Sequence, residues 1–346
     1  MKFDICGIGN PLVDILVQVP EENLSSMGLS KGGMTLIQQS QLGLLKQQIL
    51  ENVSVQRCGD STANTLVTLA LLGKNVAFVG KLGQDELGDL YKKELDDYGV
   101  ISFISKGKEG TGTCMAFITP DAERTMATYL GACLELVPQE IPIETLSNAK
   151  MLYLTGYQLE PPLREAAMAA LVQAKKANLE VALDLADSNL ITRNKEFLLG
   201  LIQEYASFVF ANEHEVIALT GFSEHKAAEK LSYLGCTAIV KLGEKGSIIQ
   251  RGRRIQEVPS FPVIVKDTTG AGDNYAAGFL YGHLEGYSLE LCGLLGSLLA
   301  AECVQNEGAR LPKDCGQNLK KMIQQLIHSY ASKKGGALWT KEKTTK

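Results

Sequence analysis

The sequence lacks an excess of basic residues: 34 lysines and arginines stand against 39 aspartates and glutamates among 346 residues, a formal net charge of −5. A surface that binds nucleic-acid phosphates normally carries such an excess, so no nucleic-acid partner is expected. The longest apolar runs, such as LLGSLLAAECV, are shorter than a membrane span, and the opening MKFDICGIGNP lacks the unbroken apolar segment of a signal peptide. We therefore expect a cytoplasmic protein that acts on a small molecule and has no membrane partner.

Two chemical patterns are also missing. The eight cysteines form no CxxC pair and no histidine stands at zinc-finger spacing, which argues against a metal ribbon and against a short disulfide scaffold. The cysteines are instead expected to be reduced and mostly buried. The pattern GxxxxGK[ST] does not occur, so any nucleotide chemistry must use something other than a P-loop.

The segments that are present predict an α/β fold. Short apolar and β-branched runs, among them NVAFVGKLG, VALDL and TAIVKLG, alternate with stretches of helical periodicity. This alternation is typical of βαβ units and of a mainly parallel central sheet covered by helices. Two of the helical stretches stop at Gly221 and Gly235, which we expect to be C-caps.

Two regions depart from this pattern and predict a small β-layer, which in an α/β protein is a candidate lid. They carry period-two alternation interrupted by the turn residues KEGTG and PDAE, without clear helical spacing. The predicted parts are a lid from residues 13–38 and 101–130, a large domain from residues 1–12, 39–100 and 131–330, and a mobile tail over residues 331–346.

The stretch GAGD, residues 270–273, precedes a run with helical spacing. Glycines at a helix entrance let the backbone approach a ligand closely, and the unpaired amides of the first turn favour an anion. Asp273 then has two interpretations: it caps the helix, or it accepts a proton from a hydroxyl that attacks a phosphate held by those amides. The four residues by themselves allow both.

Polar residues follow other expected strands, where doubly wound sheets bind their ligands. Asn10 and Asp14, in GNPLVD, are suited to ligand hydroxyls, and the short GxG before them supports a dinucleotide fingerprint only weakly. The stretch CGDSTAN places Gly59 and Asn64 at a helix entrance, where they form either a capped turn or a polyol-binding loop.

The stretch NEHE also follows an expected strand. Its Asn212 and Glu215 are three residues apart and share a helix face, so they can hold a hydrated magnesium ion or a phosphate. An N-cap with a capping box explains the same spacing equally well.

Together these stretches resemble the ribokinase-like (PfkB) carbohydrate kinase family, over nearly the whole chain. DTTGAGDNYAAGFLYG is similar to the C-terminal signature of that family, and Gly59, Asn64, Gly73 and Gly83 fall at the spacing of its N-terminal signature, with Asp60 where a second glycine is usual. NEHE matches its NxxE motif. KLGEKG matches its nucleotide motif, with a lysine where threonine is common. GNPLVDI and GTCMAFITPDAERTMATYLGA are most similar to the adenosine-kinase-like branch.

The resemblance implies a doubly wound three-layer sandwich with a β lid, and a kinase that uses ATP and Mg²⁺ to phosphorylate a primary hydroxyl. It implies that Asp273 is the catalytic base, that Gly270, Ala271 and Gly272 form the anion hole, and that Arg124 approaches the γ-phosphate from the lid. The resemblance further implies an acceptor site formed by Asn10, Asp14, Gly59, Asp60 and Asn64. It implies a nucleotide site formed by Asn212, Glu215, Lys241, Gly243 and Gly246. The implied metal sites are Glu215 for Mg²⁺, through water, and Asp267 and Thr269 for K⁺, which activates many members of the family.

Three functions stay open at this point. The leading hypothesis is a nucleoside or sugar kinase, with adenosine favoured over another nucleoside or a free sugar such as ribose or fructose. A non-catalytic sugar or nucleoside sensor on the same fold is the second, motivated by Asp60. A nicotinamide-dependent oxidoreductase is the third, and it depends on the short GxG alone. A monomer and a homodimer are both compatible with the sequence.

Overall fold

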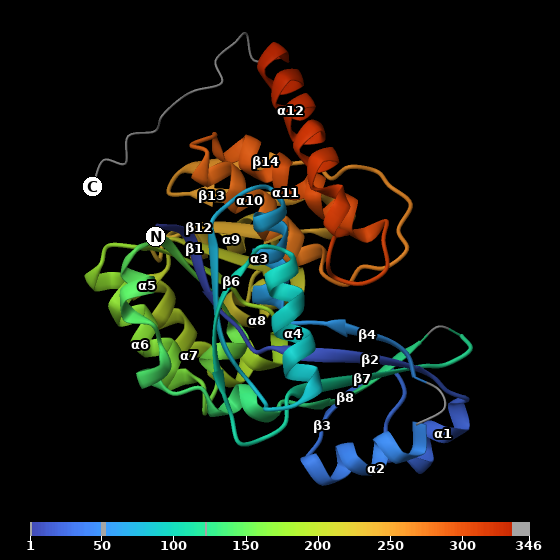
Figure 1. The fold of residues 1–346 in the computed structure, drawn as a ribbon. Coiled ribbons are helices and arrows are strands. Elements are labelled where there is room, and N and C mark those ends of the chain that lie inside the picture. Colours follow the sequence, from blue (N-terminus) through green and yellow to red (C-terminus); the bar gives the residue numbers. More distant parts are fainter. Residues whose placement is uncertain (1, 50–52, 122, 334–346) are drawn as a thin grey trace.

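The computed structural model describes residues 2–49, 53–121 and 123–333, which form two β-sheets and the helices around them (Figure 1). The larger sheet has nine strands and a mainly parallel core: β1 pairs in parallel with both β5 and β9, and only β13 and β14 run antiparallel to their neighbours. Its strands in spatial order are β14 (Arg254–Val258), β13 (Ser247–Arg251), β12 (Thr237–Lys241), β11 (Phe208–Asn212), β10 (Glu180–Asp184), β9 (Ala149–Thr155), β1 (Phe3–Ile8), β5 (Val76–Leu82) and β6 (Ile101–Lys106).

Helices cover both faces of this sheet because its strands are apolar on both sides, as parallel strands usually are. Along β9, Leu152 and Leu154 pack into one core and Met151 and Tyr153 into the other. The first core is covered by α5 (Ile143–Ser147), α6 (Arg164–Lys176), α7 (Ser188–Tyr205), α8 (Glu213–Thr220) and α9 (Glu224–Ser232). The second is covered by α3 (Ser61–Leu71), α4 (Glu86–Asp97), α10 (Ala271–Leu284) and α11 (Leu289–Val304). The expected doubly wound, three-layer fold is thus confirmed.

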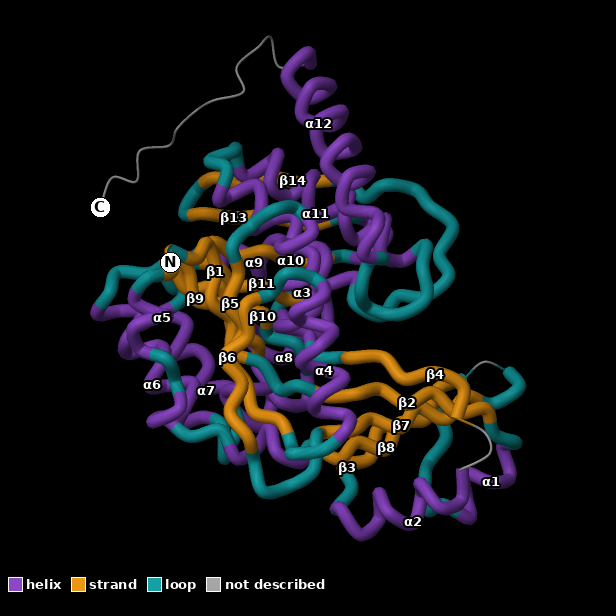
Figure 2. Tube along the Cα trace, in the orientation of Figure 1, coloured by secondary structure: helices purple, strands orange, loops and turns teal. Residues whose placement is uncertain are grey.

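The smaller sheet has its own apolar core. One of its faces packs against α1 (Glu21–Ser26) and α2 (Gln39–Ile49), and Figure 2 shows it beside the large sheet with these helices below it. Its strands in spatial order are β3 (Met34–Leu36), β8 (Arg124–Tyr129), β7 (Gly112–Ile118), β2 (Leu12–Gln18) and β4 (Val53–Cys58). We call this sheet with α1 and α2 the lid.

The boundaries of the lid differ from those expected. Residues 39–49 and 53–58 lie with the lid, because β4 pairs with β2 and because Leu42 and Leu45 of α2 pack in the lid core. Conversely, β6 pairs in parallel with β5 at the edge of the large sheet, so the second lid segment begins at β7 rather than at residue 101. Period-two alternation marks a half-buried strand but does not tell which sheet it joins.

The end of the chain also differs from expectation. The final helix α12 (Gly316–Lys333) includes the first three residues of the expected tail, and residues 334–346 lie outside the described residues. Leu319 and Ile323 pack this helix against α11. Within the part of the chain that the structure describes, every helix is too short or too polar to cross a bilayer.

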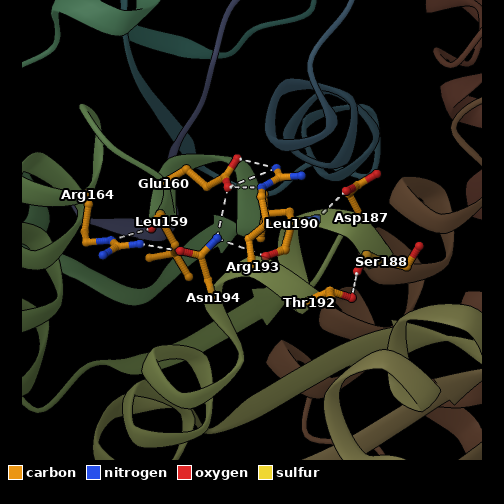
Figure 3. Close-up of polar contacts among 9 residues, drawn as sticks. All are labelled: Leu159, Glu160, Arg164, Asp187, Ser188, Leu190, Thr192, Arg193 and Asn194. Atoms are coloured by element: carbon orange, nitrogen blue, oxygen red, sulfur yellow. Dashed lines mark hydrogen bonds and ion pairs between the residues drawn. The ribbon is translucent and has the colours of Figure 1, made fainter. Parts of the chain in front are cut away.

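A polar network ties the loop after β9 to the start of α7 (Figure 3). The carboxylate of Glu160 accepts hydrogen bonds from Arg193, at 3.0 Å, and from Asn194, at 2.9 Å, while Arg164 donates to the side-chain oxygen of Asn194. Asn194 has non-helical backbone angles, φ −121° and ψ 18°, so the network sits at a kink in α7. Asp187 caps the same helix by accepting from the Leu190 amide at 2.7 Å. These contacts hold the loops that follow β9 and β10.

Close packing between α10 and α11 depends on glycine. A Cβ added at Gly278 would lie 2.3 Å from the carbonyl oxygen of Leu295 and 2.8 Å from the Cα of Gly296. Both are backbone atoms, so a side chain there would force the two helices apart. This contact matters for function because α10 is the helix that begins at GAGD.

We predict that Gly278→Ala lowers the free energy of unfolding by about 2 kcal/mol or more, since overpacking against backbone costs this much. The matched control is Gly200→Ala in α7, where an added Cβ meets nothing within 4 Å. Because glycine is a poor helix former, that variant should gain about 0.5–1 kcal/mol. Urea denaturation of both variants checks the pair, and equal stabilities would contradict it.

Candidate active site

Polar side chains gather where three neighbouring strands of the large sheet end. Asp184, Asn212 and Lys241 are the last residues of β10, β11 and β12, and the ammonium of Lys241 lies 2.7 Å from the carboxylate of Asp184. Carboxyl ends of parallel strands are where such sheets bind ligands. The run VALDL predicts the strand that Asp184 ends, but its residue pattern does not single out Asp184.

The GAGD loop opens α10 beside this cluster. Gly270 is the N-cap residue with φ 78°, and a Cβ there would lie 2.5 Å from the Cα of Ala309, so the position requires glycine. A Cβ at Gly272 would meet the ammonium of Lys241 at 3.1 Å, which places that cation against the first turn. The Ala271 amide donates to the Thr268 carbonyl at 3.2 Å. The first-turn amides of Gly272 and Asp273, with the Lys241 charge, therefore make a site suited to an anion.

Asp273 lies in the first turn of α10, facing α3. Its carboxylate accepts a 2.9 Å hydrogen bond from the side-chain amide of Asn64. Burial and the charge of Asp184 raise the pKa of Asp273, the Asn64 hydrogen bond and Lys241 oppose the rise, and the net value is about 6. At neutral pH the group is therefore ionised and a stronger base than an ordinary aspartate, as general-base catalysis of proton transfer requires.

Three of the predicted acceptor residues come together around Asp273. Asp14 on β2 faces Gly59, where an added Cβ would lie 2.8 Å from the Asp14 carboxylate, and Asn64 on α3 donates to Asp273. Arg310, which sequence reasoning missed, joins them: it donates to the Gly59 carbonyl and to the Asn64 side-chain oxygen, both at 3.0 Å. Burial raises the pKa of Asp14 to about 6, and the Arg310 charge opposes the rise. A lone arginine in EGARLP carries no sequence signal of this role.

The side chains of Asn10 and Asp60 make hydrogen bonds to other groups of the protein. The side-chain oxygen of Asn10 accepts from Gln158 at 3.0 Å. The Asp60 carboxylate caps α3, accepting from the amides of Thr62 at 3.4 Å and Ala63 at 3.2 Å, and it also accepts from the Asn10 amide. Asp60 has φ 85°, a region that favours glycine, which explains why a second glycine is usual at this position.

Asn212 and Glu215 form the capping box that was one interpretation of NEHE. The Asn212 oxygen accepts from the Glu215 amide at 2.9 Å, and the Glu215 carboxylate accepts from the Asn212 backbone amide at 2.8 Å and from its side-chain amide at 2.6 Å. Burial raises the pKa of Glu215 to about 7, with Lys241 opposing the rise and Asp184 adding to it.

Magnesium fits this corner best as a hydrated ion. Both oxygens of Glu215 are bonded to Asn212, and Asp184 is paired with Lys241. Among the described residues no group of three or more histidine, cysteine or acidic side chains could hold a metal directly. Mg²⁺ commonly keeps several waters and relies on one or two carboxylates plus substrate phosphates, and the residues present fit that arrangement.

Arg124 links the lid to the loop before GAGD. Its guanidinium, on β8, donates to Thr269 at 3.1 Å and to the Asp267 carboxylate at 3.2 Å. Burial tends to raise the pKa of Asp267, but hydrogen bonds from Thr269 and Gly308 and the Arg124 charge lower it to about 2. A monovalent cation bound by Asp267 and Thr269 would thus compete with Arg124 for the same oxygens.

Gly243 and Gly246 form the turn that follows Lys241. Both have positive φ, 58° and 96°, and the Leu242 amide closes the turn on the Gly246 carbonyl at 2.8 Å. A Cβ at Gly246 would lie 2.0 Å from the Val258 carbonyl, whereas one at Gly243 would meet nothing within 4 Å. The backbone at Gly243 therefore lies in open space, while Gly246 lets β13 begin.

Comparisons with known proteins show what the whole chain is similar to. A family model described as pfkB family carbohydrate kinase matches residues 46–314. The solved structure of an adenosine kinase from Sinorhizobium meliloti has a TM-score of 0.83 and 35% identity, covering 94% of this chain and 99% of its own. That of a probable sugar kinase from Rhizobium etli CFN 42 has the same TM-score and coverages at 33% identity. A 5-dehydro-2-deoxygluconokinase from Clostridium perfringens is 30% identical over 291 residues, 79% of this chain and 85% of that protein.

We predict that Asp60→Ala is less stable than Asp60→Gly, although both remove the cap of α3. Only glycine relieves the positive φ, so we expect Asp60→Gly to be about 1–2 kcal/mol more stable than Asp60→Ala. Guanidinium denaturation at pH 8 measures both. Equal losses would show that the backbone at position 60 is not strained.

Proposed function

Because the chain belongs to the pfkB family of carbohydrate kinases, we propose that it transfers the γ-phosphoryl group of Mg·ATP to the primary hydroxyl of a nucleoside, with adenosine as the favoured acceptor. The observation that carries the proposal is the position of Asp273, a carboxylate of raised pKa in the first turn of α10, between Asn64 and the cation of Lys241. A base next to an anion-binding turn is what in-line phosphoryl transfer needs.

In the proposed reaction Asp273 takes the proton of the acceptor hydroxyl. The oxygen of that hydroxyl forms a bond to the γ-phosphorus while the bond between this phosphorus and the β,γ-bridging oxygen breaks, and ADP leaves with the electron pair. The amides of Gly272 and Asp273, with Lys241, stabilise negative charge on the transferring group. Arg124, bound to Thr269 beside the loop, supplies a second cation from the lid. Mg²⁺ would neutralise phosphate charge, held through water by Glu215.

The face of the lid sheet that is turned away from α1 and α2 is evidence for an acceptor with a flat, apolar part. In the register of the small sheet, Asp14 shares a row with Cys114, Thr128 and Leu36, and the next row on the same face contains Leu16, Ala116, Met126 and Met34. This face also carries Arg124, so it is turned toward the GAGD loop and away from α1 and α2. Met34 is 55% exposed and Leu36 is 61% exposed. Such a surface suits a nucleobase, with Asp14 nearby for a ribose diol.

A free sugar is the second candidate, because relatives at similar identity are named sugar kinase and 5-dehydro-2-deoxygluconokinase. An ADP-release assay with adenosine, other nucleosides, ribose, fructose and 5-dehydro-2-deoxygluconate, with and without K⁺, separates the two. The highest kcat/KM is expected for adenosine. ATP turnover with a sugar alone would overturn the nucleoside assignment, and binding without any ADP release would favour a sensor.

We predict that Asp273→Asn lowers kcat by about 10²–10⁴-fold, the usual contribution of a positioned base. At pH 8 an ionised, buried carboxylate destabilises the folded state, so the variant should melt no lower than the wild type. The assay is ADP release with saturating ATP and acceptor, with thermal unfolding as the folding control. A well-folded variant that retained wild-type kcat would refute the role of Asp273.

The same carboxylate predicts a pH dependence. Because burial raises the pKa of Asp273 to about 6, the ionised fraction falls as the pH drops through that value. We expect kcat/KM to be constant above about pH 7 and to fall about tenfold per unit below pH 6. Initial rates in overlapping buffers between pH 5 and 9 measure this limb, and a flat profile down to pH 5 would contradict it.

A further inference from the structure

The structure assigns a positioning role to Arg310: its guanidinium fixes the orientation of the Asn64 side chain and the Gly59 carbonyl, and through Asn64 it holds the Asp273 carboxylate. The inference rests on the proposed function, since it names a residue that sets the geometry of the same reaction. Arg310 lies between α11 and α12, far along the chain from the residues that it contacts.

The guanidinium of Arg310 makes three hydrogen bonds in different directions. Its Nε donates to the side-chain oxygen of Asn64 at 3.0 Å, Nη2 donates to the Gly59 carbonyl at 3.0 Å, and Nη1 donates to Glu94 at 2.6 Å. The side chain is only 7% exposed. Its guanidinium carbon also lies 5.5 Å from the ring centroid of Tyr91, whose hydroxyl donates to the same Gly59 carbonyl.

These contacts leave the Asn64 amide one orientation. A guanidinium only donates hydrogen bonds, and an ionised carboxylate only accepts them. Between Arg310 and Asp273, the side-chain oxygen of Asn64 must therefore face Arg310 and its amide nitrogen must face Asp273. If Arg310 were absent, the amide could rotate and present its oxygen to the carboxylate, which would repel the ionised form.

The segment that carries Arg310 is itself fixed against α10. Asn274 donates to the Ala309 carbonyl at 2.9 Å, and the Gly308 amide donates to Asp267 at 2.9 Å. Gly270 packs so closely on Ala309 that a Cβ would lie 2.5 Å from its Cα. Arg310 therefore connects the acceptor side, Gly59 and Asn64, to the helix that carries the proposed base.

Other polar and charged groups also face Asp273, so the role of Arg310 must be separated from theirs. Asp184 and Lys241 approach from the ends of β10 and β12, and Ser61 and Asp60 approach from the start of α3. Among the described residues, none of these groups donates to the side-chain oxygen of Asn64. Arg310 is the donor to that oxygen. Control of the orientation of the Asn64 amide thus distinguishes Arg310 from the other groups near Asp273.

Arg310→Lys is the informative variant, because lysine keeps the positive charge but lacks the planar guanidinium with its several donors. A single ammonium can pair with Glu94 but cannot also donate to both Asn64 and Gly59 in the geometry of a planar guanidinium. We expect the KM for adenosine, or for the best acceptor in the screen above, to rise about tenfold or more and kcat to fall, with the KM for ATP within about twofold of the wild type. A purely structural role would lower the amount of folded enzyme without changing the acceptor KM.

The matched control is Lys313→Gln. Lys313 lies in the same segment and pairs with Asp97 of the same helix α4 at 2.7 Å, but it is 46% exposed and contacts none of the site residues named above. Its kinetic constants should stay within about twofold of the wild type. If Arg310→Lys does not fold, Arg310→Met, whose unbranched side chain cannot donate to Asn64, replaces it. In an Asn64→Ala background the effect of either Arg310 substitution on kcat should shrink.

A measurement without turnover keeps this test apart from the proposed function. The side-chain amide protons of Asn64, assigned by NMR through their loss in Asn64→Ala, should exchange with water at least about tenfold faster in Arg310→Lys than in the wild type. If the wild type transfers no phosphoryl group to any acceptor, the proposed function fails and this exchange rate alone decides the role of Arg310. An unchanged exchange rate, or an unchanged acceptor KM and kcat in an active enzyme, would overturn the inference.

Discussion

The ion pair between Asp184 and Lys241 is the interaction on which the site depends. Its 2.7 Å contact lies at the carboxyl ends of β10 and β12, against the first turn of α10. Each partner influences the carboxylates nearby: Asp184 raises the pKa values of Asp273 and Glu215, and Lys241 lowers them. Because the surroundings are largely buried, these effects are stronger than they would be in water. The pair thus gathers negative groups around one cation, which lies against the first turn of α10.

The segment from Asp267 to Arg310 connects this cluster to the two other parts of the site. Arg124 of the lid binds Asp267 and Thr269 at one end, and Arg310 binds Gly59 and Asn64 at the other. Between these ends, the helix α10 carries Asp273. Contacts with the lid, with the acceptor loop and with the proposed base therefore all reach one helix entrance, whose glycines allow that close approach.

Much of the fold could be predicted from the sequence because it depends on local patterns. Apolar runs separated by helical periodicity are sufficient to predict a doubly wound sheet, and Gly221 does end α8 in a left-handed conformation. Strand partners are not local, and this is why the lid boundaries in the structure differ from those expected: the alternation of β6 is the same at the edge of either sheet. The spacing of Asn212 and Glu215 predicted their shared helix turn, and the structure adds the capping bonds between them.

The fold class, the GAGD entrance and the set of polar strand ends can all be predicted from the sequence, since each follows from local residue types and their spacing. Only the tertiary structure decided which of those groups meet. It placed Asn64 against Asp273 and turned Asp60 into a helix cap, and it introduced Asp184 and Arg310, whose neighbours lie tens to hundreds of residues away. The physical reason is that burial and charge pairing arise from contacts distant in the chain, and these contacts control the pKa of a base and the orientation of an amide.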